Sequence, residues 1–153
     1  MAPQRLELEI TESLVMRNMH VARTTLQQVR ALGVRVTLDD FGTGYSSLSH
    51  LRALPIDTLK VDRAFIADLD GGGESRAIVS AIVGLARAMQ LTVTAEGVET
   101  EAQMAALTAL GIDDAQGYLL ARPMPARDFT AFLTVWRGRA AMTTALPQAA
   151  RSA

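Results

Sequence analysis

The 153-residue chain has no cysteine, and its only histidines are His20 and His50. The absence of cysteine excludes disulfide bonds and thiolate chemistry, and two histidines are too few for a histidine-rich zinc site. Any metal site in this chain must therefore be built mainly from carboxylates.

The chain also lacks an excess of charge of one sign and any long apolar run. Its net charge is -1 and its pI is near 6.1, so it offers no broad basic field for a nucleic acid polymer or an anionic membrane, although it can still bind a compact anion. No segment reaches the roughly 18 apolar residues of a membrane span, and the first residues do not resemble a secretory signal. We therefore expect no membrane segment and a cytoplasmic location.

What the sequence does have is a strict alternation of strand-like and helix-like segments. Hydrophobic residues make up 49% of the chain, enough for the core of one domain. Strands are predicted at residues 6–10, 34–38, 56–61, 91–95 and 115–119, and helices near 22–33, 48–54, 78–89, 100–111 and 128–136. This alternation favours an α/β fold with parallel strands, either a barrel or an open sheet. Residues 137–153 show little periodicity and are predicted to form a flexible tail.

Polar side chains lie where the predicted strands end: Glu9, Asp39, Asp40, Lys60, Asp62, Glu96 and Gln116. In a parallel barrel all of these ends point to one face, which is where such folds carry their active sites. Converging carboxylates repel one another unless cations lie between them, and hard oxygen ligands favour magnesium or manganese. Taken singly, each carboxylate could instead be a solvated or helix-capping residue.

The adjacent pair Asp39 and Asp40 points to more specific chemistry. Neighbouring residues at a strand end splay apart, so one carboxylate can bridge two ions while the other contacts one, as two-metal phosphoester chemistry requires. An Asp-rich turn is the alternative. Gly42 and Gly44 allow the following loop to approach a ligand or to change conformation, and an ordinary tight turn explains them equally well.

Lys60 is the only lysine among the 15 basic residues. A lysine side chain at a strand end can steer a metal-bound water as an ammonium or deprotonate it as a free amine, which a guanidinium does poorly. An ion pair with Asp62 is the simpler interpretation, and it is compatible with the catalytic one.

Five motifs, read in order, resemble the EAL family of cyclic di-GMP phosphodiesterases. They are residues 9–13 (EITES), 39–47 (DDFGTGYSS), 60–62 (KVD), 95–100 (AEGVET) and 116–118 (QGY). The resemblance covers about residues 6 to 136 and implies a TIM-type (β/α)8 barrel. It also implies hydrolysis of cyclic di-GMP to the linear dinucleotide pGpG with the help of two Mg²⁺ or Mn²⁺ ions.

The resemblance further implies roles for individual residues. Glu9 and Asp39 look like ligands of a first metal ion, and Asp39, Asp40 and Glu96 like ligands of a second. Lys60 resembles the residue that positions or activates the attacking water, so Lys60 and Glu96 are candidate catalytic residues.

Other matched positions are implied to support this centre. Gln116 is a third candidate catalytic residue, Glu12 looks like the anchor of the loop at 39–47, and Asp62 and Glu99 look like supporting groups. In the family this loop couples the metal site to a dimer interface. Its flexible residues here would be Phe41, Gly42, Thr43, Gly44, Tyr45, Ser46 and Ser47.

The chain also departs from the family pattern. The Glu-Ala-Leu segment that names the family, and an asparagine ligand one strand later, are absent, as if the sequence began at strand 4 of the barrel. We therefore expect residues 1–136 to form the C-terminal portion of the barrel, strands 4 to 8, and to need a second copy or the missing N-terminal part to cover its open edges. The parent domain is expected to be an enzyme. The chain alone could be an inactive fragment or a regulatory module that binds cyclic di-GMP or dimerises.

Overall fold

The computed structural model describes residues 1–42, 48–69 and 73–143, with side chains described as far as residue 136. It divides the chain into two compact units, 1–121 and 122–153, each of which is described by itself. In the part of the chain that is described, no helix has the length and apolar character needed to cross a membrane.

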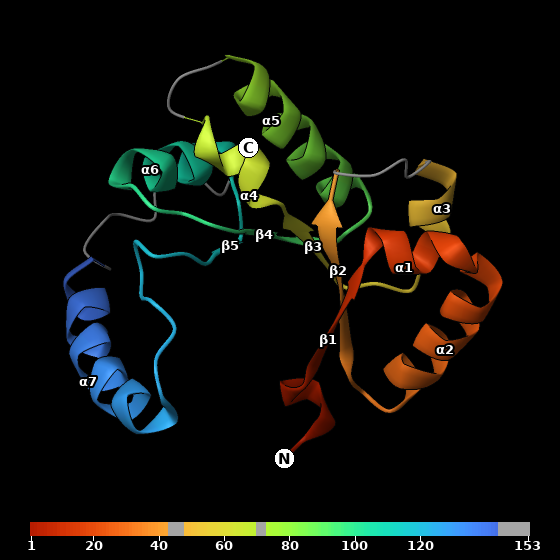
Figure 1. Ribbon diagram of the computed structural model, residues 1–153, viewed down its shortest axis with the longest axis horizontal. Coiled ribbons are helices and arrows are strands. Elements are labelled where there is room, and N and C mark those ends of the chain that lie inside the picture. Colours follow the sequence, from red (N-terminus) through yellow and green to blue (C-terminus); the bar gives the residue numbers. More distant parts are fainter. Residues whose placement is uncertain (43–47, 70–72, 144–153) are drawn as a thin grey trace, which may run out of the picture. The chain divides into compact units, whose positions relative to one another are not determined.

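The first unit is built on a five-stranded sheet in which every neighbouring pair of strands is parallel. The strands follow the chain order across the sheet (Figure 1): β1 (Glu7–Thr11), β2 (Arg35–Phe41), β3 (Thr58–Val61), β4 (Thr92–Ala95) and β5 (Asp114–Ala115). The predicted parallel α/β fold is confirmed. All carboxyl ends of the strands therefore meet at one rim.

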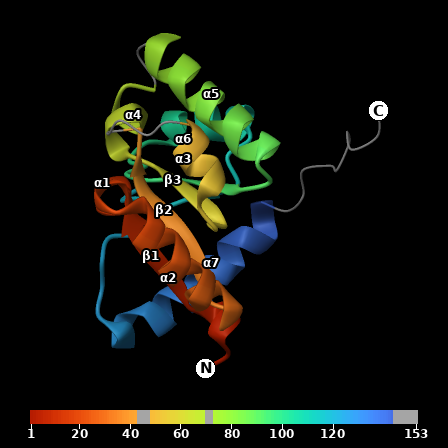
Figure 2. The same cartoon turned by 90° about the vertical axis from the view of Figure 1, so that its right-hand side faces the viewer.

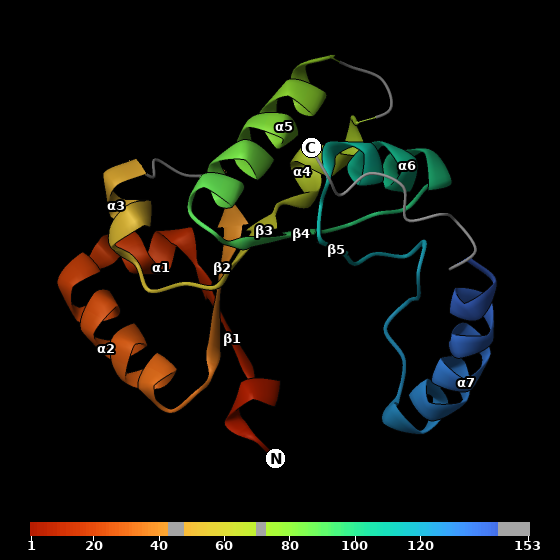
Figure 3. The same cartoon turned by 180° about the vertical axis from the view of Figure 1, so that it is seen from behind.

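The helices of this unit lie on the outer, convex side of the curved sheet, as Figures 1 and 3 show from opposite sides. Figure 2 shows α2 running along β2, with which it is in contact. The helical segments are η1 (Pro3–Arg5), α1 (Glu12–Arg17), α2 (Met19–Ala31), α3 (Leu48–Ala53), α4 (Arg63–Ala67), α5 (Gly73–Ala88) and α6 (Glu101–Leu110).

The alternation of side chains along the strands separates an apolar face from a polar one. Leu38 and Leu59 pair across the sheet and are fully buried in the core under the helices. On the opposite face, Glu9 pairs with Thr37 and Thr37 with Thr58. Because side chains of paired parallel residues point the same way, the concave face carries a polar row.

Two aspartates fix the strand register at the end opposite the rim. Asp57 accepts a hydrogen bond from the Val36 N–H (2.9 Å) and donates its own N–H to the Val36 carbonyl (2.8 Å). Asp113 repeats this pattern with Val93, at 2.8 and 3.1 Å. Each aspartate thereby ties the start of one strand to the segment that leads into the next.

The structure departs from the predicted elements in the fifth strand and in two short helices. The fifth strand was expected at 115–119, but it spans only Asp114–Ala115, because Gly117 packs directly against the backbone of Val98 and the chain turns there. Helices α1 and α4 lie in segments for which no helix was predicted. Helix α1 has six residues and α4 has five, and such short helices do not show a helical period in the sequence.

The second unit contains helix α7 (Ala126–Thr143), which continues beyond the predicted helix end at Trp136. Phe129, Phe132 and Trp136 stack along it, with ring centroids 6.1 and 5.5 Å apart. The division into a barrel portion, 1–136, and a tail, 137–153, stays a prediction, and residues 144–153 lie outside the described part of the chain.

Candidate metal centre at the strand ends

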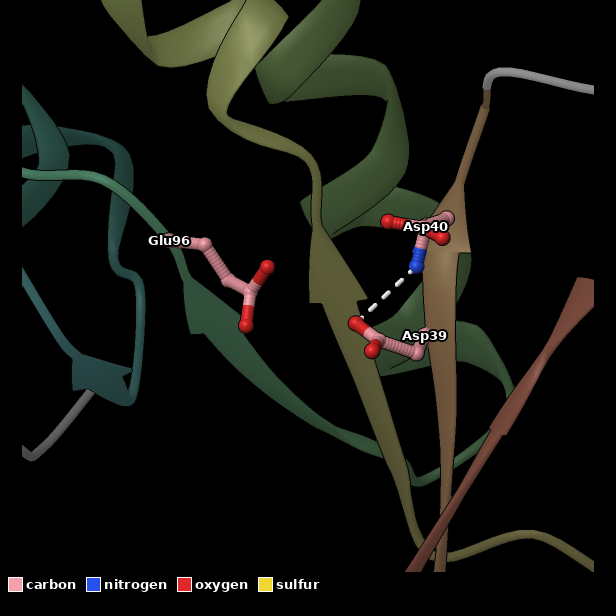
Figure 4. A group of neighbouring side chains, drawn as sticks. All are labelled: Asp39, Asp40 and Glu96. Carbon is pink, nitrogen blue, oxygen red and sulfur yellow. Dashed lines mark hydrogen bonds between the residues drawn. The ribbon is translucent and has the colours of Figure 1, made fainter.

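Three predicted metal ligands come together at the rim. Asp39 and Asp40 lie at the end of β2, and Glu96 directly follows β4. One carboxylate oxygen from each lies within 4.8 Å of the others, and Figure 4 shows all three side chains turned toward a common space. Among the described residues, Asp39, Asp40 and Glu96 form the acidic group whose spacing could hold a metal ion.

A β-bulge explains how two adjacent aspartates reach the same rim. Leu38 pairs with Leu59 and Phe41 with Val61, so β2 uses one more residue than β3 between these pairs. Asp40 absorbs the extra residue in a left-handed conformation with φ 57°, and its N–H donates to Asp39 Oδ1 at 3.0 Å. Asp39 and Asp40 thereby each bring a carboxylate oxygen to within 4.8 Å of one on Glu96.

Lys60 lies at the centre of this acidic group. Its ammonium Nζ is 2.5 Å from Glu96 Oε1, 2.9 Å from Glu9 Oε1 and 3.5 Å from Asp39 Oδ1. Its side chain is only 7% exposed. Glu9, the fourth predicted ligand, is thus joined to the group through Lys60 and does not belong to the set within 4.8 Å.

The electrostatics of the rim follow from this arrangement. Burial lowers the pKa of Lys60, but the hydrogen bonds with Glu96 and Glu9 outweigh it, so the pKa lies well above its ordinary value. The pKa of Asp40 is raised by burial and by the negative charges of Asp39 and Asp62. Lys60 therefore carries a positive charge at neutral pH, and Asp40 holds its proton more tightly than an ordinary aspartate does.

Gln116 lies next to Glu96, as its predicted role requires. Its side-chain Nε2 donates to Glu96 Oε1 at 2.7 Å. Its backbone carbonyl accepts from the Val98 N–H (3.1 Å), and the Leu119 N–H donates to the Val98 carbonyl (3.0 Å). The segment after β4 and the segment after β5 are thus held together beyond the ends of the strands, which orients Gln116 toward the acidic group.

Glu12 begins α1 and contacts the first part of the predicted loop. Its side chain is 2% exposed, and Oε2 accepts from the Gly42 N–H at 3.2 Å. The other oxygen, Oε1, is buried and accepts no hydrogen bond from the described residues. Phe41 is buried at the end of β2, and Thr43 to Ser47 lie outside the described residues. The contact with Gly42 agrees with a role for Glu12 as a loop anchor.

Asp62 is close enough to Asp40 for its charge to raise the pKa of Asp40, but the hydrogen bond and ion pair described for Asp62 and Glu99 are with other residues. Asp62 caps α4 by accepting a hydrogen bond from the Ala64 N–H at 2.8 Å. The ion pairs of Lys60 with described residues are with other carboxylates. Glu99 forms an ion pair of 2.8 Å with Arg63.

Arg63 was not identified as a site residue from the sequence. Its side chain packs on Gly97, where a Cβ atom would lie 2.5 Å from Arg63 Cγ, and Gly97 has φ 70°. The glycine directly after Glu96 was the available signal, since it allows both this close approach and the turn at the strand end.

The residues present fit a divalent metal ion. The donors are carboxylate oxygens from different strands, with no sulfur or imidazole among the three, and such a set suits Mg²⁺ or Mn²⁺. Burial and the repulsion from Asp39 and Asp62 raise the pKa of Asp40, and a bound cation would relieve that repulsion. Their assignment as metal ligands, like the roles of Lys60, Gln116 and Glu12, stays a prediction.

Comparison with known proteins places the chain in a family. The family model described as "EAL domain" matches residues 1–123. The bifunctional diguanylate cyclase/cyclic di-GMP phosphodiesterase MucR of Pseudomonas aeruginosa is 52% identical over 129 residues, which is 84% of this chain and 19% of MucR. The chain thus spans about a fifth of the length of this relative.

Solved structures agree with this placement. The MucR phosphodiesterase in complex with c-di-GMP is similar with a TM-score of 0.81 at 51% identity, over 84% of this chain and 52% of that structure. BlrP1 of Klebsiella pneumoniae, in a manganese/cy-diGMP complex, has a TM-score of 0.76 at 36% identity, over 80% and 31%. The predicted partial TIM-type barrel is confirmed by these matches. The chain belongs to the EAL domain family.

Proposed function

We propose that this chain is part of a cyclic di-GMP phosphodiesterase, which hydrolyses cyclic di-GMP to pGpG with Mg²⁺ or Mn²⁺. The observation that supports it most is the convergence of Asp39, Asp40 and Glu96 at the carboxyl ends of parallel strands. That rim is where barrel enzymes carry their active sites. Relatives named as cyclic di-GMP phosphodiesterases, such as MucR, share about half of the sequence over this region.

In this proposal, Asp39, Asp40 and Glu96 hold one divalent ion, and Glu9 with Asp39 contributes to a second. Such ions neutralise phosphate charge and lower the pKa of water that would attack the phosphorus. Two side chains of this chain would position the proposed metal ligand and the loop beside it. Gln116 fixes the Glu96 carboxylate through its 2.7 Å hydrogen bond, and Glu12 holds Gly42 at the start of the loop.

Lys60 is proposed to orient the attacking water as a hydrogen-bond donor. Its raised pKa keeps the ammonium protonated in the ion-free protein, which favours donation over removal of a proton. Asp62 and Glu99 would support the site indirectly, Asp62 by placing α4 and Glu99 by holding Arg63 against Gly97.

A second candidate function is a regulatory module that binds cyclic di-GMP or dimerises without turnover. The Glu-Ala-Leu segment and its following asparagine ligand are not in this sequence, so the first metal position has fewer protein ligands. Two exposed apolar residues also lie at the start of the edge strand β1: Leu6, directly before it, is 47% exposed, and Leu8, within it, is 39% exposed. A second copy, or the N-terminal part of a barrel, would cover this edge.

One assay separates the candidates. The purified chain is incubated with cyclic di-GMP and MnCl₂, pGpG is followed by chromatography, and ligand binding is measured in parallel by calorimetry. We expect turnover that Asp39→Asn abolishes and Arg30→Met leaves unchanged, because Arg30 pairs with Asp57 away from the rim. Binding without turnover would favour the regulatory module, and the absence of both would refute a function of this chain on its own.

A further inference from the structure

The described structure gives Lys60 three carboxylate partners at once. Glu96 and Glu9 accept hydrogen bonds from the ammonium, and Asp39 lies 3.5 Å away. An ammonium has three N–H donors, so these partners leave little capacity for a water molecule. The role proposed above therefore requires that Lys60 release at least one carboxylate before it can hold a water.

Two of these partners, Asp39 and Glu96, are also proposed metal ligands. Glu96 is the closest partner of Lys60, at 2.5 Å. A carboxylate oxygen cannot keep this short contact at full strength while it coordinates a divalent ion, because the two cations repel each other. Lys60 and the ions therefore compete for the same oxygens.

We propose that Lys60 is a built-in counter-ion of the ion-free site, which holds Glu9, Asp39 and Glu96 together and gives up these contacts when divalent ions bind. This rests on the proposed metal site. It has two opposite consequences: Lys60 stabilises the ion-free protein, and it weakens the binding of the ions. A residue that only positioned water would not produce both effects.

The first test compares Lys60→Met, which keeps most of the side-chain length and removes the charge, with Lys60→Arg, which keeps the charge. Mn²⁺ affinity is measured by calorimetry, and thermal unfolding is followed in EDTA. We expect Lys60→Met to bind Mn²⁺ about tenfold more tightly or better and to unfold about 5 °C lower in EDTA. Lys60→Arg should stay within about threefold of the unsubstituted protein in affinity.

Arg30→Met is the matched control, because it breaks the 2.7 Å ion pair with Asp57 outside the acidic group. It should leave Mn²⁺ affinity unchanged. Equal or weaker Mn²⁺ binding by folded Lys60→Met, with binding intact in the unsubstituted protein, would overturn the counter-ion role and leave the proposed function standing. No Mn²⁺ binding by either protein would overturn both proposals.

A second test needs no substitution, because Lys60 is the only lysine in the chain. Growth with ¹³C-labelled lysine therefore gives side-chain NMR signals from this residue alone. We expect the Cε signal to shift saturably during a Mg²⁺ titration, with the midpoint that calorimetry gives for ion binding. A Cε signal that does not move when the site is saturated with Mg²⁺ would refute the exchange of partners.

Discussion

Replacing Gly117 by alanine tests how the segments beyond β4 and β5 are held together. An added Cβ atom would lie 2.1 Å from the Val98 carbonyl oxygen and 2.3 Å from the Val98 nitrogen. The closest comfortable carbon–oxygen contact is roughly 3.3 Å. These are backbone atoms, so no side-chain rotation can relieve the overlap, and the two segments must separate by about 1 Å.

The expected loss of stability follows from the contacts that this separation breaks. The hydrogen bonds Val98 N–H to Gln116 O (3.1 Å) and Leu119 N–H to Val98 O (3.0 Å) each contribute about 1 kcal/mol. Overpacking adds about 1–3 kcal/mol. Gly117→Ala should therefore lower the free energy of unfolding by about 3 kcal/mol or more.

Urea unfolding followed by far-UV circular dichroism measures this loss. Gly84→Ala is the matched control, because Gly84 lies exposed in α5 and an added Cβ atom there has nothing within 4 Å. Alanine favours a helix over glycine, so the control should raise the free energy of unfolding by about 0.5–1 kcal/mol. A Gly117→Ala protein within about 0.5 kcal/mol of the unsubstituted one would refute the close packing of Gly117 on Val98.

Three further substitutions test other parts of the structure by the same unfolding assay. Asp40→Asn should raise the free energy of unfolding in EDTA, because the pKa of Asp40 is raised by burial and by Asp39, and a lower value would contradict that repulsion. Asp57→Ala should cost about 2 kcal/mol, since the Val36 N–H loses a charged acceptor, and an unchanged midpoint would show that this bond is dispensable. Thr100→Ala removes the N-cap of α6 and should cost about 1 kcal/mol; no loss would mean that the cap is replaced by solvent.

The sequence was sufficient for the parts of the fold that rest on local patterns. The helix predicted near 100–111 is α6, which is bounded by the capping box of Thr100 and Gln103 and by the left-handed Gly111, and such signals act within a few residues. The placement of Asp39 at the end of β2 and of Glu96 at the end of β4 was also predictable, because the carboxyl ends of parallel strands share one rim.

What the sequence could not show depends on contacts between distant segments. The β-bulge at Asp40 arises from the register between β2 and β3, and nothing in residues 38–41 alone distinguishes it from a regular strand. The partners of Lys60 depend in the same way on three separate strand ends, so the nearby Asp62 was an incorrect guess for its ion pair.

Direct measurement of Mn²⁺ binding, by electron paramagnetic resonance of the free ion, tests the acidic rim on which the account depends. Glu96→Gln is compared with Arg30→Met, which breaks the ion pair with Asp57 outside the acidic group. We predict that the unsubstituted chain and Arg30→Met bind Mn²⁺ with similar affinity and that Glu96→Gln binds it at least about tenfold more weakly. Equal Mn²⁺ binding by Glu96→Gln and the unsubstituted chain would contradict a metal centre formed by Asp39, Asp40 and Glu96.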